Sequence, residues 1–363
     1  MLLYLSLVLI IPVLYGVFLN NEYRDKIILV TVCSMMFLLL SLRKPFSDIL
    51  SYLDIYNSLK GVPFSEMIRD FHIIKTSSMA YGEWGYCFIC WVFVNLGLPF
   101  QLFLVFESAF CVFCVFNFVN KNSVNLSLSI ALIVGFGVFD YMYIIIRQTM
   151  ALGFLLLSFE YIKKRNLPAF LAFVLAATMM HRTALLFLVV YPLSYLPVTR
   201  INAVIFGCAS LLIIPLYPFA ERLFLRKLMM VFMKDAYMVE TAVFEFSELI
   251  ILISIIAIFL MVFYDKNKAL EVRDKAAFWA FMISLPLQAT ACYMSILGRV
   301  STLTFLPFAG VAIPNLLETN DNKKLVRIFE ILIYLAALAY YAFCLYYDKR
   351  ILEIVPYKMF FMD

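Results

Sequence analysis

Long apolar runs separated by short polar turns fill most of this sequence, and they restrict its fold more than any other feature. A helix of roughly 20 apolar residues spans the roughly 30 Å hydrocarbon core of a bilayer. Of the 363 residues, 65% are apolar and 15% are charged, whereas soluble proteins average about 45–50% and about 25%. Apolar runs this long exclude a β-barrel, so the backbone N–H and C=O groups must form their hydrogen bonds within helices. The sequence predicts an all-α integral membrane protein with a single polytopic domain over residues 1–363.

The apolar windows predict a helical bundle of about twelve spans. We expect them over residues 2–18, 27–42, 84–119, 126–139, 141–162, 167–180, 183–196, 201–219, 247–264, 276–293, 300–317 and 328–346. The first window is too long and too apolar at its start for a signal peptide. Gly97-Leu98-Pro99 breaks the third window, and the 13 residues from Trp84 to Leu96 are few for a crossing. We expect this piece to be a short re-entrant or lateral helix.

Basic turns set the predicted orientation of the bundle. Lys and Arg cluster in residues 163–165, 266–275 and 323–327, which favours the cytoplasmic side for these turns. Two polar loops then face outward, the first over residues 43–83 and the second over residues 220–246. Two full spans within 84–119 would instead place the first loop in the cytoplasm, but the short piece before Gly97 favours the external arrangement.

A hairpin over residues 144–185 brings cationic residues to one level. Arg147 lies sixteen residues before the basic turn 163–166, and Arg182 lies sixteen residues after it. In two antiparallel helices both arginines lie about 24 Å from the turn, close to the outer edge of the membrane. Charges held there are expensive and usually functional. The polar residues predicted on this side are Arg147, Gln148, His181, Arg182 and, at the start of a later span, Arg299.

The first loop adds carboxylates and aromatic residues to the same side: Arg43, Asp48 and Tyr52 near its start, then Glu83, Trp84 and Tyr86 at its end. Each type also has an ordinary explanation. An arginine at a span end is often a snorkelling anchor, a tyrosine often an interfacial belt residue, and a lone histidine often a packing residue. The coincidence of several arginines at one level favours a functional site, because guanidinium groups bind a diphosphate through paired hydrogen bonds.

Metal, redox and nucleic-acid chemistry are not indicated. Two cysteine pairs have CxxC spacing, Cys87/Cys90 and Cys111/Cys114, but they lie in apolar runs without nearby histidine or charge, which favours packing. The chain has two histidines, too few for a histidine-based metal site. We therefore predict no metal and no cofactor. The net charge of +5 is spread over loops, which suits an anionic lipid substrate rather than nucleic acid.

Short motifs occur in a recognisable order. They are R-x4-D-x3-Y from Arg43, E-x-G-Y from Glu83, I-R-Q-x-x-A from Ile146, a basic turn, and A-x4-H-R-T-A from Ala176. In this order they resemble the EpsG and Wzy-type family of bacterial polysaccharide polymerases over about the first 200 residues. Beyond these residues, only the hydropathy pattern and Arg299 correspond to the family. The chain departs from the family pattern at Phe46-Ser47, where a pair of small residues is common, and after His181, where Arg182-Thr183 stands in place of a nearer hydroxyl residue.

The resemblance implies a GT-C-like, metal-independent glycosyltransferase in the bacterial cytoplasmic (inner) membrane, with an active site facing the periplasm or cell exterior. It would transfer a glycan from undecaprenyl diphosphate to the next lipid-linked oligosaccharide, making O-antigen, capsule or exopolysaccharide. Membrane lipids, a Wzz-like chain-length regulator and a Wzx-like flippase are the implied partners, and nucleic acid is not.

Each candidate residue has an expected role in that reaction. Cations stabilise the leaving diphosphate, and the expected ones are Arg147, Arg182 and Arg299, with Gln148 orienting. A base must take the acceptor proton, and the candidates are Glu83 and Asp48, ranked slightly ahead of His181. Aromatic side chains contact sugars, and the candidates are Tyr52, Trp84 and Tyr86. Arg43 completes the set expected to bind substrate.

Other functions remain open at this point. A flippase or transporter of lipid-linked sugars also needs an arginine-lined cavity, but it more often shows repeats and broken helices at mid-membrane depth. A ligase that moves finished polysaccharide to a lipid A core would use similar groups. An acyltransferase acting on sugars would depend on His181, and a purely structural membrane protein is the remaining alternative.

Overall fold

The computed structural model describes residues 1–69, 83–220, 248–263, 270–347 and 357–361. The regular elements of these residues are helices, together with one isolated antiparallel bridge between Arg43 and Met359. Most of the second predicted loop, residues 221–246, and the part of the first loop from 70 to 82 lie outside the described residues.

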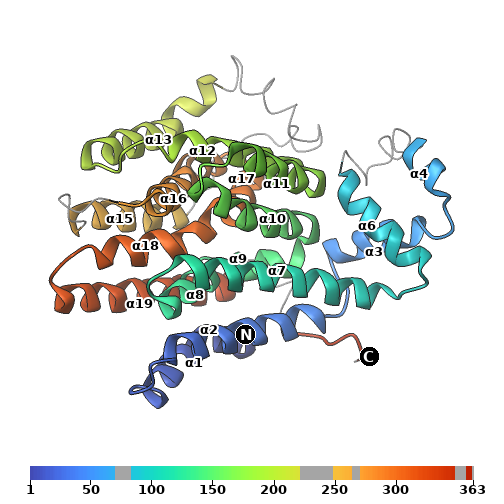
Figure 1. Cartoon of the computed structure of the whole chain (residues 1–363), viewed down its shortest axis with the longest axis horizontal. Helices are drawn as coiled ribbons and strands as arrows, with labels where there is room; N and C mark the ends of the chain where they lie inside the picture. Colours follow the sequence, from blue (N-terminus) through green and yellow to red (C-terminus); the bar gives the residue numbers. More distant parts are fainter. Residues whose placement is uncertain (70–82, 221–247, 264–269, 348–356, 362–363) are drawn as a thin grey trace.

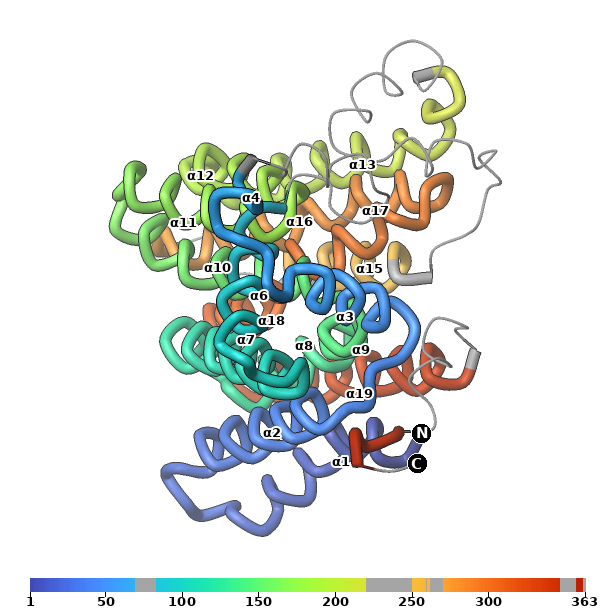
Figure 2. Tube along the Cα trace, turned by 90° about the vertical axis from the view of Figure 1, so that its right-hand side faces the viewer, coloured from blue at the N-terminus to red at the C-terminus, as the bar shows by residue number. Residues whose placement is uncertain are grey.

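Most of the longer helices run roughly along one direction and form a bundle (Figure 1). The short helices α3, α4 and α6 gather at one end of it, and Figure 2 views the bundle from that end. The elements are α1 (Leu2–Val17), α2 (Arg24–Ser41), α3 (Asp48–Ser58), α4 (Phe64–Arg69), α6 (Trp84–Asn95), α7 (Phe100–Asn122), α8 (Leu126–Gly135), α9 (Val138–Ile144), α10 (Ile146–Lys163), α11 (Leu167–Met180), η1 (Arg182–Val189), α12 (Val190–Leu193), α13 (Arg200–Ala220), α15 (Glu248–Phe263), α16 (Val272–Ala291), α17 (Ser295–Val300), η4 (Ser301–Phe305), η5 (Leu306–Phe308), α18 (Ala309–Glu318) and α19 (Lys323–Tyr347).

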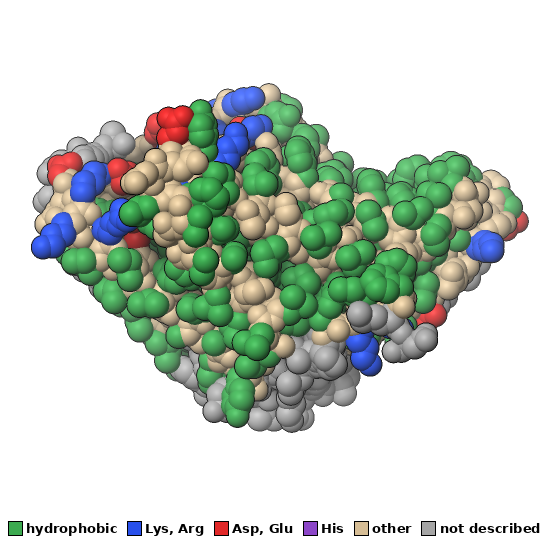
Figure 3. Space-filling model, turned by 90° about the horizontal axis from the view of Figure 1, so that it is seen from below, with side chains coloured by type: hydrophobic (Ala, Val, Ile, Leu, Met, Phe, Trp, Pro, Cys, Tyr) green, Lys and Arg blue, Asp and Glu red, His purple; other side chains and the backbone are tan. Residues whose placement is uncertain are grey.

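The helices carry the apolar surface of a membrane protein. Four stretches in the described residues are long and apolar enough to cross a bilayer, and α8 with α9 makes a fifth if the bent pair is one span. The four are Phe100–Asn122, Arg200–Phe219, Ser295–Glu318 and Lys323–Tyr346. Hydrophobic side chains cover the middle of the face in Figure 3, and charged side chains lie at its ends and along its edges. The all-α membrane prediction is confirmed, whereas about twelve spans and the GT-C-like arrangement remain predictions.

Helix breaks agree with the sequence at one place and differ at another. The predicted break at Gly97-Leu98-Pro99 is confirmed, because α6 ends at Asn95 and α7 begins at Phe100. The expected boundary near residue 140 is instead a 55° bend between α8 and α9, at Gly137, followed by a break at Ile145. Gly137 has φ 78°, a left-handed conformation that glycine adopts without a Cβ clash. Hydropathy does not change at this bend, so the apolar pattern could not locate it.

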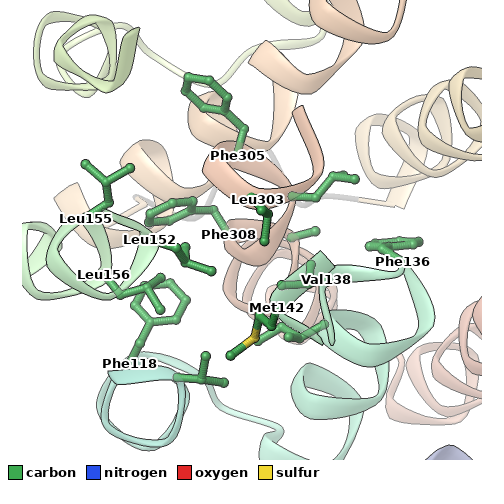
Figure 4. Close-up of a cluster of buried hydrophobic side chains, with 14 of the residues drawn as sticks. Phe118, Phe136, Val138, Met142, Leu152, Leu155, Leu156, Leu303, Phe305 and Phe308 are labelled. Carbon is green, nitrogen blue, oxygen red and sulfur yellow. The ribbon is translucent and has the colours of Figure 1, made fainter. Parts of the chain in front are cut away.

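A buried aromatic and aliphatic core packs the middle of α10 against the rest of the bundle. Figure 4 shows Phe118, Leu152, Leu156 and Phe308 among the side chains of this core. The ring centroids of Phe118 and Phe308 are 5.1 Å apart, with the planes nearly perpendicular. Close packing of this kind resists displacement, so α7, α10 and η5 form a rigid support for the charged residues nearby.

A polar network joins several helices at the end of the bundle that carries the basic turns. The side-chain amide of Asn315 donates to the carbonyl of Asn122 (2.9 Å) and to Asp274 Oδ1 (2.8 Å), and its oxygen accepts from the Val124 N–H (3.0 Å). Lys163 of the hairpin turn donates to Asn122 Oδ1 at 2.7 Å. Buried polar groups that are satisfied in this way hold helix ends in register.

We expect Asn315→Leu to destabilise the protein without touching the other end of the bundle. The substitution leaves the Asn122 carbonyl and the Val124 N–H without this partner and removes one hydrogen bond to Asp274, which still accepts from Arg273. Such losses cost about 1–3 kcal/mol of unfolding free energy. Denaturation in detergent followed by helical circular dichroism measures the change. Asn117→Leu, at a half-buried position of the same helix as Asn122, is the matched control, and an equal effect of both variants would contradict the role of the network.

Candidate active site

Glu83 lies between an arginine and a histidine from distant parts of the chain. Its Oε2 pairs with Nη1 of Arg147, and its Oε1 contacts Nδ1 of His181. The carboxylate precedes α6, while the arginine begins α10 and the histidine follows α11. The Glu83 side chain is 5% exposed, and that of His181 is 23% exposed. We call Glu83, Arg147 and His181 the Glu83 cluster.

Local backbone features bring the three groups together. A Cβ at Gly85 would lie 2.5 Å from Cε of Met180 and 2.9 Å from Cβ of Met179, so this glycine lets the start of α6 pack directly against the end of α11. His181 ends α11 in an extended conformation (φ −157°, ψ 126°). The extended residue turns the chain out of the helix, which allows its ring to reach the carboxylate.

The electrostatics of the cluster keep the carboxylate ionised. Glu83 lies outside the stretches long enough to cross a membrane. Burial opposes its ionisation, but His181 and the neighbouring guanidinium groups of Arg147 and Arg182 hold the pKa of the carboxyl below its usual value. A carboxylate held in this way can fix the positions of the cations around it before any anionic ligand arrives.

Two tyrosines surround Arg147. Its guanidinium carbon lies 5.3 Å from the ring centroid of Tyr52, and the Tyr52 and Tyr86 rings meet edge to face at 5.8 Å. Both tyrosines are buried. The structure therefore brings these two predicted residues to the cluster, as neighbours of the arginine rather than as an exposed sugar platform.

Asp48, Gln148 and Arg299 form a second group from three elements. Arg299 Nη1 lies 3.9 Å from Asp48 Oδ2, and the two side chains are 34% and 51% exposed. Gln148 is buried, and its amide donates to the backbone carbonyl of Arg299 at 3.4 Å. Since Gln148 and Arg147 are adjacent on α10, this contact links the second group to the Glu83 cluster.

The remaining predicted site residues, Arg182, Trp84 and Arg43, lie in three different environments. Arg182 is half-buried at the start of η1 and acts electrostatically on Glu83. Trp84 is half-buried and stacks on Phe88, with the ring centroids 5.4 Å apart. Arg43 lies in the interior, away from the external position expected for it, and its Nη2 pairs with Oε2 of Glu107 at 3.1 Å.

Sequence reasoning missed Glu107 altogether. The residue lies within α7, and neither it nor Arg43 has any exposed side-chain surface. One signal was available: a carboxylate within an apolar helix is costly and needs a partner. The sequence offered no means of identifying that partner, which is 64 residues away.

No group of three or more His, Cys, Asp and Glu side chains that could hold a metal ion occurs among the residues that the structure describes. The cysteines of both CxxC pairs are buried and free. The absence of a metal from the reaction stays a prediction.

The fold and this site together define a polytopic helical membrane protein with a charged cluster at one end of its bundle. The chain belongs to the EpsG family, whose sequence model matches residues 26–359. The match confirms the resemblance read from the motifs and extends it over nearly the whole chain, which makes this a polysaccharide-polymerase-type membrane protein. No curated protein and no solved structure matches the chain.

Proposed function

We propose that this protein joins undecaprenyl-diphosphate-linked oligosaccharide repeat units at the outer face of the bacterial cytoplasmic membrane, as a glycosyltransferase that needs no metal. The observation that carries the proposal is the Glu83 cluster, in which one buried carboxylate holds an arginine and a histidine side by side. This arrangement supplies both groups that glycosyl transfer from a diphosphate needs: a cation for the leaving group and a base for the acceptor.

The donor side of the reaction uses the arginines. The bond between the anomeric carbon and the diphosphate oxygen breaks, and negative charge grows on the departing lipid diphosphate. The Arg147 side chain is 20% exposed, so part of it remains accessible to phosphate oxygens. Arg182 and Arg299 add positive charge nearby. A cation fixed in advance stabilises the charge that develops in the transition state.

The acceptor side uses His181. Both carboxylate oxygens of Glu83 already have partners, Arg147 and His181, and the group is nearly inaccessible. The histidine directs Nδ1 towards Glu83, which leaves the opposite ring nitrogen to take the proton of the acceptor hydroxyl as its oxygen bonds to the anomeric carbon. We therefore place His181 as the base and Glu83 as its orienting group. This reverses the order in which sequence reasoning ranked them.

The lipid-linked sugars of a strain lacking this gene test the proposed function. We expect single repeat units to accumulate on the carrier at the outer face, with polymer restored when the gene is returned. Accumulation of repeat units at the inner face would indicate a flippase instead. Full-length polymer on the carrier would indicate a ligase. Purified protein with lipid-linked repeat units in proteoliposomes should then form longer glycans without another protein.

We expect the two ends of the bundle to face opposite sides of the membrane. A cysteine placed at the exposed Asn57 on α3 should react with an impermeant thiol reagent in intact spheroplasts, and one at the exposed Lys324 should react after lysis only. Both are introduced after replacing Cys208, the exposed native cysteine. Protection of the Asn57→Cys variant in spheroplasts would contradict an outward-facing site.

A further inference from the structure

The segment 357–361 near the carboxyl terminus, here called the C-terminal strap, pairs with the connection between α2 and α3. Figure 1 shows this segment next to the C mark, towards the end of the bundle that carries α3 and α6. Arg43 and Met359 face each other as an antiparallel bridge. The backbone hydrogen bonds run from the Lys44 N–H to the Lys358 carbonyl (2.9 Å) and from the Phe360 N–H to the Leu42 carbonyl (3.0 Å).

Side chains of the strap add to this pairing. The Tyr357 hydroxyl donates to the carbonyl of Leu39, in the last turn of α2, at 3.2 Å. Its ring lies 6.3 Å from that of Tyr4 and 6.2 Å from that of Tyr143. Edge-to-face aromatic contacts of this kind stabilise packing beyond the area they bury. The strap is thus held by α1, α2 and α9 as well as by the connection itself.

The connection is also tied to the interior through Arg43. Its guanidinium pairs with Glu107 of α7, with both side chains fully buried, and lies 5.5 Å from the ring centroid of Tyr143. A buried ion pair is strongly disfavoured when one partner is displaced, because a charge is then left uncompensated. Backbone pairing on one side and an ion pair on the other leave the connection little freedom to move.

The position of this connection decides where α3 lies. The helix starts at Asp48, directly after Ser47, which has φ 46°. Phe46, one residue earlier, packs on Tyr143 with centroids 5.6 Å apart. From this start α3 carries Asp48 to Arg299 and Tyr52 to Arg147. A shift of the connection would therefore move both contacts with the site.

We propose that the C-terminal strap and the Arg43–Glu107 pair are positioning elements of the active site. The strap clamps the α2–α3 connection over the buried pair, and the connection in turn sets α3 so that Tyr52 meets Arg147. Arg43 then acts through α3, in place of the direct substrate contact expected from the sequence. The proposal rests on the proposed function, because it concerns the turnover of the same site.

Two truncations test the strap. Ending the chain after residue 356 removes the strap, while ending it after Phe360 keeps all the contacts described above and is the matched control. We expect the shorter chain to lose at least tenfold in turnover number with a smaller change in KM for the lipid-linked donor, and the control to keep full turnover. Equal turnover in both, with the wild type active, would overturn the strap proposal and leave the proposed function standing.

A readout without catalysis separates the two proposals. Tyr52 is buried, so a Tyr52→Cys variant should resist an impermeant thiol reagent in the full chain and react at least several-fold faster in the chain ending at 356. No acceleration would overturn the strap proposal even if the wild type made no polymer. Inactive wild type with accelerated labelling would instead reject the proposed function and retain the strap.

A point variant covers the case in which the truncated chain does not fold. Phe360→Pro removes the N–H that bonds to Leu42, and Met359→Pro removes an N–H that takes no part in these two bonds. We expect the first to lower turnover and expose position 52, and the second to leave both unchanged. The same behaviour of both proline variants would contradict the clamp.

Discussion

Replacing Arg147 with lysine is expected to lower polymerisation turnover by about 100-fold, the range found when one preplaced donor to a developing negative charge is removed. The lysine keeps a positive charge beside Glu83 but loses the planar fork of donors. Charge alone does not replace two-pronged phosphate binding. Because the interaction strengthens as the leaving group departs, the loss should appear mainly in kcat.

The measurement is single-turnover formation of the first glycan linkage by purified protein, with folding checked by its detergent melting curve. Arg24→Lys is the matched control, since Arg24 pairs with Asp25 on a part-exposed helix start remote from the Glu83 cluster. Arg24→Lys keeps the charge, and ion pairs near the surface contribute little, so this variant should stay within about twofold of wild type. Full activity of the Arg147→Lys protein would remove Arg147 from the diphosphate role.

The second large effect is expected at His181. A general base contributes about 10²–10⁴-fold, so His181→Asn should lower turnover by that factor. Glu83→Gln should cause a loss of similar order, because the amide no longer orients the ring or balances Arg147. The two residues act as a unit, and the double variant should therefore be scarcely worse than either single variant.

Thr178→Val provides the control, since the Thr178 hydroxyl bonds within its own helix at the Val174 carbonyl and lies one turn before His181. It should retain wild-type turnover. A His181→Asn protein that polymerises normally while Glu83→Gln is inactive would assign the base to Glu83. Losses that simply multiply in the double variant would show that the two side chains work independently.

The Glu83 cluster also explains how several cations can share one place before substrate binds. Like charges repel, and partly buried guanidinium groups lose hydration. The buried Glu83 carboxylate, which pairs with Arg147 and interacts electrostatically with Arg182, offsets both costs. Preorganisation of this kind lets the site meet the growing phosphate charge without reorganising.

Several features of the site were predictable from the sequence. The apolar runs required membrane helices, and the short piece before Gly97 indicated a separate helix, now seen as α6. Equal spacing of Arg147 and Arg182 from the basic turn placed the two helix ends at one level, and the structure joins Arg147 and His181 there through Glu83. These inferences succeed because hydropathy and the rise per residue are properties of a single helix, and its own sequence is enough to predict them.

Sequence determined the class of fold, the hairpin and the identity of the charged residues, whereas tertiary packing alone decided which of them meet. The Arg43 side chain points inward and pairs with Glu107. Its backbone forms a bridge with Met359 of the strap, 316 residues further along the chain. Gln148 faces a backbone carbonyl, and Glu83 is enclosed while His181 is accessible. Contacts such as these depend on how separate helices pack. The residue pattern within one helix does not show which other helix it will contact.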